Sequence, residues 1–223
     1  MKSFVAMVAA LVLVIGTQAQ ESSPVAQALV KAARQQVGVT KEYDPAYVAL
    51  DYPGGDVPIQ TGVCSDVLVR AFRNLGIDLQ KEIHEDMQNN FSAYPQKWGL
   101  KVPDKNIDHR RVPNLMRYFE RQQIALPEKL ERPESYRPGD IVAWDLGGGV
   151  LHIGIVSDKL SGRAPLIIHN IGGGAQEEDI LFKYRVIGHY RLKAAVQATA
   201  PDRGTPNPAT TNQFPFGSAS SRR

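Results

Sequence analysis

GDIVAWDLGGGVLHIGIVSD, residues 139–158, carries two short apolar runs that are separated by three consecutive glycines. The runs 141–146 and 151–157 are rich in β-branched side chains and are bounded by turn residues, a pattern typical of strands. Runs of the same kind follow at 166–171 and 186–192. Short strands joined by short turns predict an antiparallel sheet in the C-terminal part of the chain.

The N-terminal half carries a different pattern. Apolar residues recur there at helical spacing and predict helices over 23–37, 64–75, 79–91 and 112–123. The segment 39–61 is rich in Tyr, Pro, Gly and Asp and predicts a long structured loop. Helices first and strands second predict an α+β fold, in which N-terminal helices pack on a C-terminal antiparallel sheet.

The first residues have the composition of a secretory signal peptide. Lys2 precedes the apolar run 4–15, and small residues lead to a plausible cleavage site after Ala19. The run is too short to span a bilayer, and no Cys follows it as a lipid attachment site. We therefore expect residues 1–19 to be removed and the product to be periplasmic or secreted, without stable membrane insertion.

The chain of 223 residues has the balance of a folded protein, with 43% hydrophobic and 22% charged residues. We expect a single domain over 20–195 and a flexible tail over 196–223, where Ala, Pro, Thr, Asn and Ser dominate. The net charge is only +3, and the basic residues form no clustered stripe. This distribution argues against nucleic acid as a partner.

Cys64 is the one cysteine of the chain, so it has no intramolecular disulfide partner in an oxidising compartment. Its position at the start of a predicted helix directs backbone N–H groups at the sulfur, which favours a thiolate with a lowered pKa. Cys64 is thus a candidate nucleophile. The alternative is a small buried side chain without chemistry.

Two histidines of the predicted sheet are candidates for the base that a nucleophilic cysteine needs. If Ser157 pairs with Ala164 across the turn, His152 lies directly opposite His169, and both side chains share one face. Gly154 would leave room beside them for a helix end or a substrate.

Two other side chains compete with His169 for the role of orienting His152. A register shift by one residue would bring Asn170 to this position. The turn through the three glycines would bring Asp145 beside His152.

Several motifs resemble a known family. Residues 25–191 resemble DUF1287, a bacterial family of unknown function, through GVCSDV, HEDM, GDIVAWDL, HIGIVSD, HNIG and GHYR. The order of a helix with Cys and strands with His is also similar to that of NlpC/P60-type cysteine peptidases of the papain-like superfamily. That similarity implies a papain-like fold in which Cys64 is the nucleophile, His152 the base and His169 its orienting residue.

The same similarity implies a substrate and has one departure. Enzymes of the NlpC/P60 type commonly cut amide bonds in peptidoglycan stem peptides. Their pattern usually has Asp immediately before the Cys, whereas Val63 stands here and the nearby acid is Asp66. The substrate specificity of that family is therefore not carried over to this chain.

Further polar residues are candidates for binding a substrate. Tyr43, Tyr47 and Asp56 of the long loop, together with Asp66, are placed where they would line a groove beside Cys64. Packing of the loop is the alternative role for them. The glycine runs do not follow the strand-to-helix pattern of phosphate-binding loops, so no nucleotide site is expected.

Three functions fit these residues. The first is an exported cysteine amidase or peptidase that acts on peptidoglycan or peptides and needs no cofactor. The second is a metal-dependent hydrolase, whose ligands would be nearby carboxylates and some of the histidines His152, His169, His189 and His84. The third is a non-catalytic module that binds the cell envelope.

Overall fold

The computed structural model describes residues 22–126 and 132–193. The predicted signal peptide and the predicted tail lie outside these residues, as does the segment 127–131. No helix of the described ranges is long and apolar enough to cross a membrane.

The described residues form four α-helices where the sequence predicts them. Ser23 accepts a hydrogen bond from the Ala26 N–H at 3.2 Å and caps the first helix. All four helices end one to three residues before the predicted ends, because the last residues of each periodic run form turns. The helices are α1 (Pro24–Arg34), α2 (Cys64–Arg73), α3 (Leu79–Asn90) and α4 (Val112–Arg121).

The strands form one antiparallel sheet in the order β6-β5-β4-β3-β7. The sequence predicts four of them, although β4 extends four residues beyond its predicted end. The sheet consists of β3 (Ile141–Asp145), β4 (Leu151–Ser161), β5 (Ala164–Asn170), β6 (Ala175–Glu178) and β7 (Arg185–Tyr190). The sequence misses β6, which is short and polar. A separate parallel pair joins β1 (Glu42–Tyr43) to β2 (Thr61–Gly62), and three 3-10 turns lie at Phe91–Ala93, Asp108–Arg110 and Pro133–Ser135.

The predicted register between β4 and β5 is wrong by two residues. Ile155 pairs with Ile168 and Val156 with Ile167, which puts His169 opposite Gly154 and not opposite His152. At the turn the error is four residues, because Ser161 and not Ser157 pairs with Ala164, and a bulge between Val156 and Leu160 reduces it to two. Because side chains alternate with a period of two, this shift leaves His152 and His169 on the same face.

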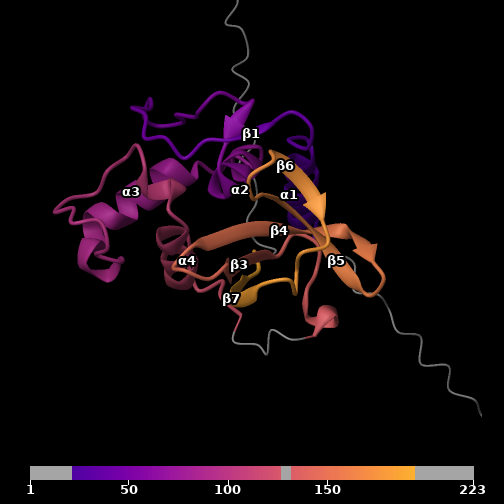
Figure 1. The fold of residues 1–223 in the computed structure, drawn as a ribbon. Coiled ribbons are helices and arrows are strands. Elements are labelled where there is room, and N and C mark those ends of the chain that lie inside the picture. Colours follow the sequence, from indigo (N-terminus) through magenta and orange to yellow (C-terminus); the bar gives the residue numbers. More distant parts are fainter. Residues whose placement is uncertain (1–21, 127–131, 194–223) are drawn as a thin grey trace, which may run out of the picture.

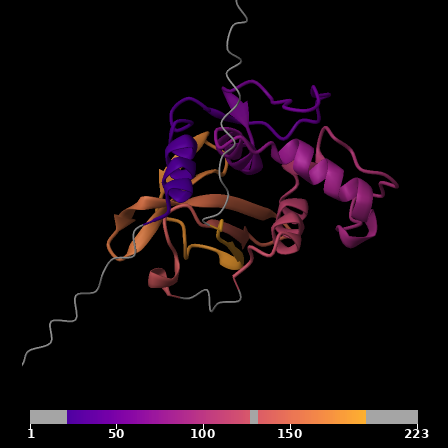
Figure 2. The ribbon, with the colours of Figure 1, turned by 180° about the vertical axis from the view of Figure 1, so that it is seen from behind.

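The two faces of the sheet bury different clusters. Helices α1 and α2 lie over one face, and α3 lies further from the strands (Figure 1; Figure 2 shows the opposite side). The helix-covered face contributes residues that pack in the main core, among them Ile141, Ala143, Ile153, Ile155 and Ile168. The other face buries Val142, Trp144, Val156 and Ile167 against Tyr136, Ile180 and Leu181.

The long loop before α2 is ordered by one buried arginine. Arg70 of α2 donates to the Asp56 carboxylate at 2.9 Å and to the Thr61 carbonyl at 2.9 Å. It also donates to the carbonyls of Val57 and Pro58 and to the Thr40 hydroxyl. Asp56, a predicted groove residue, therefore holds the loop in place through Arg70 and Arg73.

Candidate active site

Cys64 is the first residue of α2 and is almost completely buried, with 3% of its surface exposed. The helix start is fixed by Asp66, whose carboxylate accepts the Val63 N–H at 2.7 Å. Arg110 binds both oxygens of the same carboxylate at 3.0 Å. Asp66 is thus engaged in holding the helix end and is not among the pocket-lining residues, so its role in binding substrate stays a prediction.

The start of α2 contacts β4 beside the end of its pairing with β5. The paired stretch of the two strands ends at Ile155 and Ile168, so residues 151–154 of β4 lie outside it. The Ile153 N–H donates to the thiol from these residues. On the other strand, Asn170 donates to the Gly62 carbonyl at 2.9 Å and fastens the segment before Cys64. Asn170 therefore positions the helix start and does not orient His152.

The thiol environment differs from the prediction of a lowered pKa. Burial and the nearby Asp66 carboxylate raise the pKa of the Cys64 thiol to about 11. The N–H groups of Ile153, Ser65 and Cys64 itself act in the opposite direction but do not outweigh burial. At neutral pH the thiol is protonated, and its reaction as a nucleophile needs a base.

His152 and His169 form a buried pair. The distance from His152 Nε2 to His169 Nδ1 is 3.1 Å, and the rings meet edge to face. Burial, together with the neighbouring His169 ring, lowers the pKa of His152 to about 3. Burial and Lys183 lower the pKa of His169 to about 4. Both rings are neutral at neutral pH, and among the described residues no hydrogen bond involves His152 Nδ1.

Asp145, the third candidate for orienting His152, is engaged by another residue. Asp145 pairs with Leu151 across the turn, and its carboxylate binds Arg185. The residue of β3 opposite His152 is Trp144, with ring centroids 5.7 Å apart. The room predicted beside Gly154 is filled, because a side chain there would meet Ile167 Cγ2 at 2.7 Å.

Cys64 and His152 lie on opposite faces of the sheet, next to the same peptide of β4. Strand alternation turns His152 toward Trp144, whereas Ile153 faces the main core that contains Cys64. The thiol nevertheless binds the N–H of Ile153, the peptide that joins this residue to His152. Within the described chain, no hydrogen bond joins the thiol to His152. Catalytic hydrogen bonds are often long in the absence of substrate.

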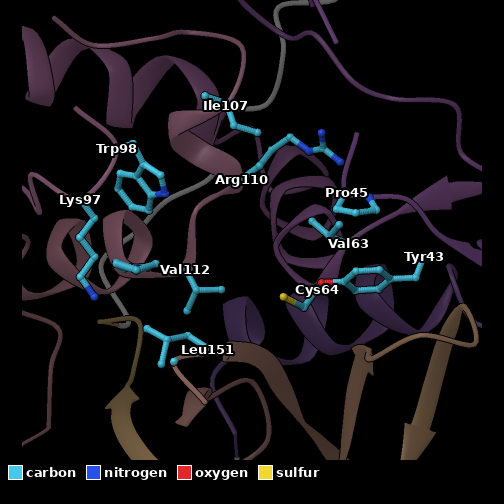
Figure 3. A pocket seen from close by; sticks show the side chains of 12 residues that line it. Tyr43, Pro45, Val63, Cys64, Lys97, Trp98, Ile107, Arg110, Val112 and Leu151 are labelled. Atoms are coloured by element: carbon cyan, nitrogen blue, oxygen red, sulfur yellow. The ribbon is translucent and has the colours of Figure 1, made fainter. Parts of the chain in front are cut away.

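Cys64 lies at a pocket of about 320 Å³. In Figure 3 the Tyr43 hydroxyl points at Cys64 from one side, while Lys97 and Trp98 lie at the other end of the pocket. Burial and the hydrogen bond to the thiol raise the pKa of Tyr43 to about 12. The lining residues are Tyr43, Pro45, Val63, Cys64, Lys97, Trp98, Ile107, Arg110, Val112, Pro113, Gly149 and Leu151.

The pocket includes residues that the sequence did not indicate and lacks three that it did, Tyr47, Asp56 and Asp66. Tyr47 is not in the lining: its hydroxyl contacts Asp104 at 3.1 Å and accepts from the Asn106 amide, so it holds two loops together. Lys97 and Trp98 lie in a polar segment without periodicity, which gives no sequence signal. Their place in the pocket depends on tertiary packing alone.

The histidines outside the pair do not gather with it. His189 hydrogen-bonds to Asp140 at 2.7 Å, and His84 packs against Tyr52 and contacts Gln88. No group of three or more His, Cys, Asp or Glu side chains among the described residues is arranged to hold a metal ion. The donors that the metal hypothesis requires are therefore not brought together.

Comparison with known proteins identifies relatives. The family described as a domain of unknown function (DUF1287) matches residues 30–192. The uncharacterized protein YijF of Escherichia coli (strain K12) is 59% identical over 165 residues, which are 74% of this chain and 80% of YijF. No solved structure matches the chain. These matches confirm the DUF1287 resemblance and leave the NlpC/P60 similarity as a proposal.

Proposed function

Because the chain belongs to the DUF1287 family, whose description names no activity, we propose a function from the site itself. The protein is a cysteine hydrolase that cleaves amide bonds in peptides, with Cys64 as nucleophile and His152 as base. The observation that carries this proposal is the setting of the thiol. The thiol lies at a pocket and at a helix start, and three backbone N–H groups surround it. One of them belongs to the peptide that joins Ile153 to His152, a member of the buried histidine pair.

The neutral state of both groups indicates a general-base mechanism. His152 Nδ1 takes the proton of the Cys64 thiol while the sulfur bonds to the substrate carbonyl carbon. For this step the imidazole has to reach the thiol past the β4 backbone, because His152 and Cys64 lie on opposite faces of the sheet. The carbonyl oxygen becomes negatively charged, and the N–H groups of Ser65 and Ile153 together with the Tyr43 hydroxyl are the donors positioned to stabilise it.

The second half of the reaction returns the enzyme to its starting state. The C–N bond breaks, and the leaving amine takes the proton from His152. Water then attacks the thioester carbonyl and gives its proton to His152. The carbonyl–sulfur bond breaks, and the sulfur regains the proton, so the net reaction consumes one water for each amide bond.

The pocket favours a substrate that carries an anionic group next to an apolar one. Trp98 forms an aromatic wall, held by the Arg111 guanidinium at 4.1 Å from the ring centroid. Lys97 has no carboxylate partner among the described residues, and no Asp or Glu lines the pocket. Peptides with a free carboxylate fit this charge, and the stem peptides of peptidoglycan are such substrates.

We further propose that the protein acts outside the cytoplasm, because its sequence begins with the features of a signal peptide. The papain-like relationship to NlpC/P60-type peptidases belongs to the same proposal. The order of the Cys helix and the His strands supports it.

The test is digestion of purified peptidoglycan by the mature protein, with mass spectrometry of the released fragments. The proposal expects soluble fragments from the native protein and none from Cys64→Ala. A short peptide library with free and amidated carboxyl ends identifies the bond that is cut. Equal digestion by Cys64→Ala would reject the cysteine mechanism, and binding without any fragment would favour a non-catalytic envelope module.

A further inference from the structure

His169 has a second nitrogen that is buried without a hydrogen-bond partner. The side chain is fully buried, and Nε2 makes no hydrogen bond. The nearest acid is Glu178, whose Oε2 lies 3.6 Å from this nitrogen. Glu178 belongs to β6, and 41% of its side chain is exposed. The carboxylate therefore lies between solvent and the histidine pair.

The hydrogen bond between the two rings contains a single proton, and its position decides whether His152 can act as a base. If the proton is on His152 Nε2, then His152 Nδ1 carries a lone pair and can accept the thiol proton. If the proton is on His169 Nδ1, then His152 carries its proton on Nδ1 and cannot accept another as a neutral ring. The geometry of the pair alone allows both tautomers.

A carboxylate at the far end selects between them. A neutral His169 that accepts at Nδ1 carries its own proton on Nε2, which is the nitrogen that faces Glu178. A carboxylate only accepts hydrogen bonds, so it favours that tautomer. The opposite tautomer would turn a lone pair of His169 toward a negative charge.

We infer that Glu178 is a positioning residue that fixes His169 as an acceptor and thereby leaves Nδ1 of His152 free to take the Cys64 proton. The inference rests on the proposed function and extends its site by a residue from the edge strand. Glu178 neither touches substrate nor receives the proton. Its carboxylate also partly offsets the positive charge that forms on His152 during the reaction.

The other charged or titratable groups around the pair do not replace this role. Lys183, after β6, acts on His169 with a positive charge and opposes protonation of the ring. Trp144 on β3 is uncharged, and its N–H donates to the Leu181 carbonyl. Asp145 on β3 is engaged by Arg185. Glu178 is thus the negative group in position to select the tautomer.

The experiment compares Glu178→Ala with Glu178→Gln, whose amide oxygen still accepts a hydrogen bond. Asp179→Ala is the matched control, because it removes the neighbouring acid, which is exposed and makes no hydrogen bond in the structure. Imidazole ¹⁵N NMR at neutral pH reads the tautomers of His152 and His169 directly. The rate at which iodoacetamide alkylates Cys64 reports whether His152 acts as the base. Circular dichroism confirms that each variant is folded.

We expect the native protein and Asp179→Ala to carry both protons on Nε2, and Glu178→Gln to keep this state. Glu178→Ala should populate the other tautomer and slow alkylation by about 10- to 100-fold, by analogy with loss of the partner that orients a metal-bound histidine. Unchanged spectra and rate in Glu178→Ala would overturn the inference. If His152→Ala also leaves the alkylation rate unchanged, the proposed base itself fails, which separates the two outcomes.

Discussion

The buried His189 hydrogen-bonds at 2.7 Å to Asp140, a carboxylate that Arg191 also binds through both oxygens. His152 and His169 lie on the same face of the sheet, but no carboxylate forms a hydrogen bond with either ring in the described structure. The first cluster, Asp140 with His189 and Arg191, contains an ion pair. The second cluster, His152 with His169, is a pair of neutral rings, each of which has one nitrogen outside the hydrogen bond between them.

The difference separates a charged cluster, which we expect to be structural, from the neutral one that we propose to be reactive. Burial raises the pKa of Asp140, but hydrogen bonds from Arg191 and His189 outweigh burial and lower it below its ordinary value. This carboxylate stays charged and satisfied, which joins β3 to the end of β7. The neutral pair has no such compensation, so burial opposes the protonation of either ring.

The sharpest way to separate the clusters is to remove one histidine from each. We expect His152→Ala to reduce peptide hydrolysis by about 10²- to 10⁴-fold, the usual contribution of a general base. His189→Asn should leave the activity of the folded protein unchanged, because His189 is distant from the pocket lining. The measurement is the steady-state rate per folded molecule. Equal losses in both variants would mean that His152 acts only through stability.

For stability we expect the opposite order, in which the Asp140 cluster contributes more than the pair of His152 and His169. Asp140→Asn removes a buried charge from Arg191 and His189 and should lower the free energy of unfolding by about 3 to 5 kcal/mol. His169→Asn removes one hydrogen bond between neutral rings and should lower it by about 1 kcal/mol. Urea unfolding followed by circular dichroism measures both. A larger loss for His169→Asn would show that the neutral pair is the structural one.

Acid should destabilise the protein through the neutral pair. The folded-state pKa values of about 3 for His152 and about 4 for His169 lie below the ordinary 6.5. Their contribution is complete above pH 6.5 and is lost as the pH falls, because the unfolded chain binds protons first.

The matching measurement is the free energy of unfolding between pH 6.5 and 5, where most carboxylates stay ionised. The native protein should lose stability across this window more steeply than a variant with both His152→Gln and His169→Asn. His109, whose pKa burial and Arg110 lower to about 4, remains in both proteins and cancels in the comparison. Equal slopes would contradict the neutral, buried state of the pair.

Much of the fold follows from local pattern. Helical periodicity and capping predict the start of α1 at Ser23 and the start of α2 at Cys64, and β-branched runs predict four strands. The strand β6 has the sequence AQEE, which contains no apolar alternation. It forms because its backbone pairs with β5, with Gln176 opposite His169. No local signal predicts such pairing, and Glu178 was missed with it.

The site was predictable only in its local parts. The helix start at Cys64 follows from apolar residues spaced by one helical turn. The shared face of the two histidines follows from the two-residue alternation of strands. The docking of α2 against β4, beside the end of its pairing with β5, is a tertiary contact. It determines the burial that raises the thiol pKa, and it uses Asn170 as an anchor. A helix start alone predicted the opposite pKa direction, because burial outweighed the backbone donors.

The smallest expected effect is on the binding of a charged substrate. Its measurement tests whether the pocket at Cys64 is a binding site. Lys97→Glu should raise KM for a peptide with a free carboxylate by about 3- to 10-fold, with kcat nearly unchanged, as for an exposed ion pair worth about 1 kcal/mol. Lys101→Glu makes the same charge change on an exposed residue outside the lining and should have no effect. A peptide with an amidated carboxyl end should not distinguish Lys97→Glu from the native protein. If both peptides respond equally, Lys97 acts on the general field of the surface, and the carboxylate is bound elsewhere.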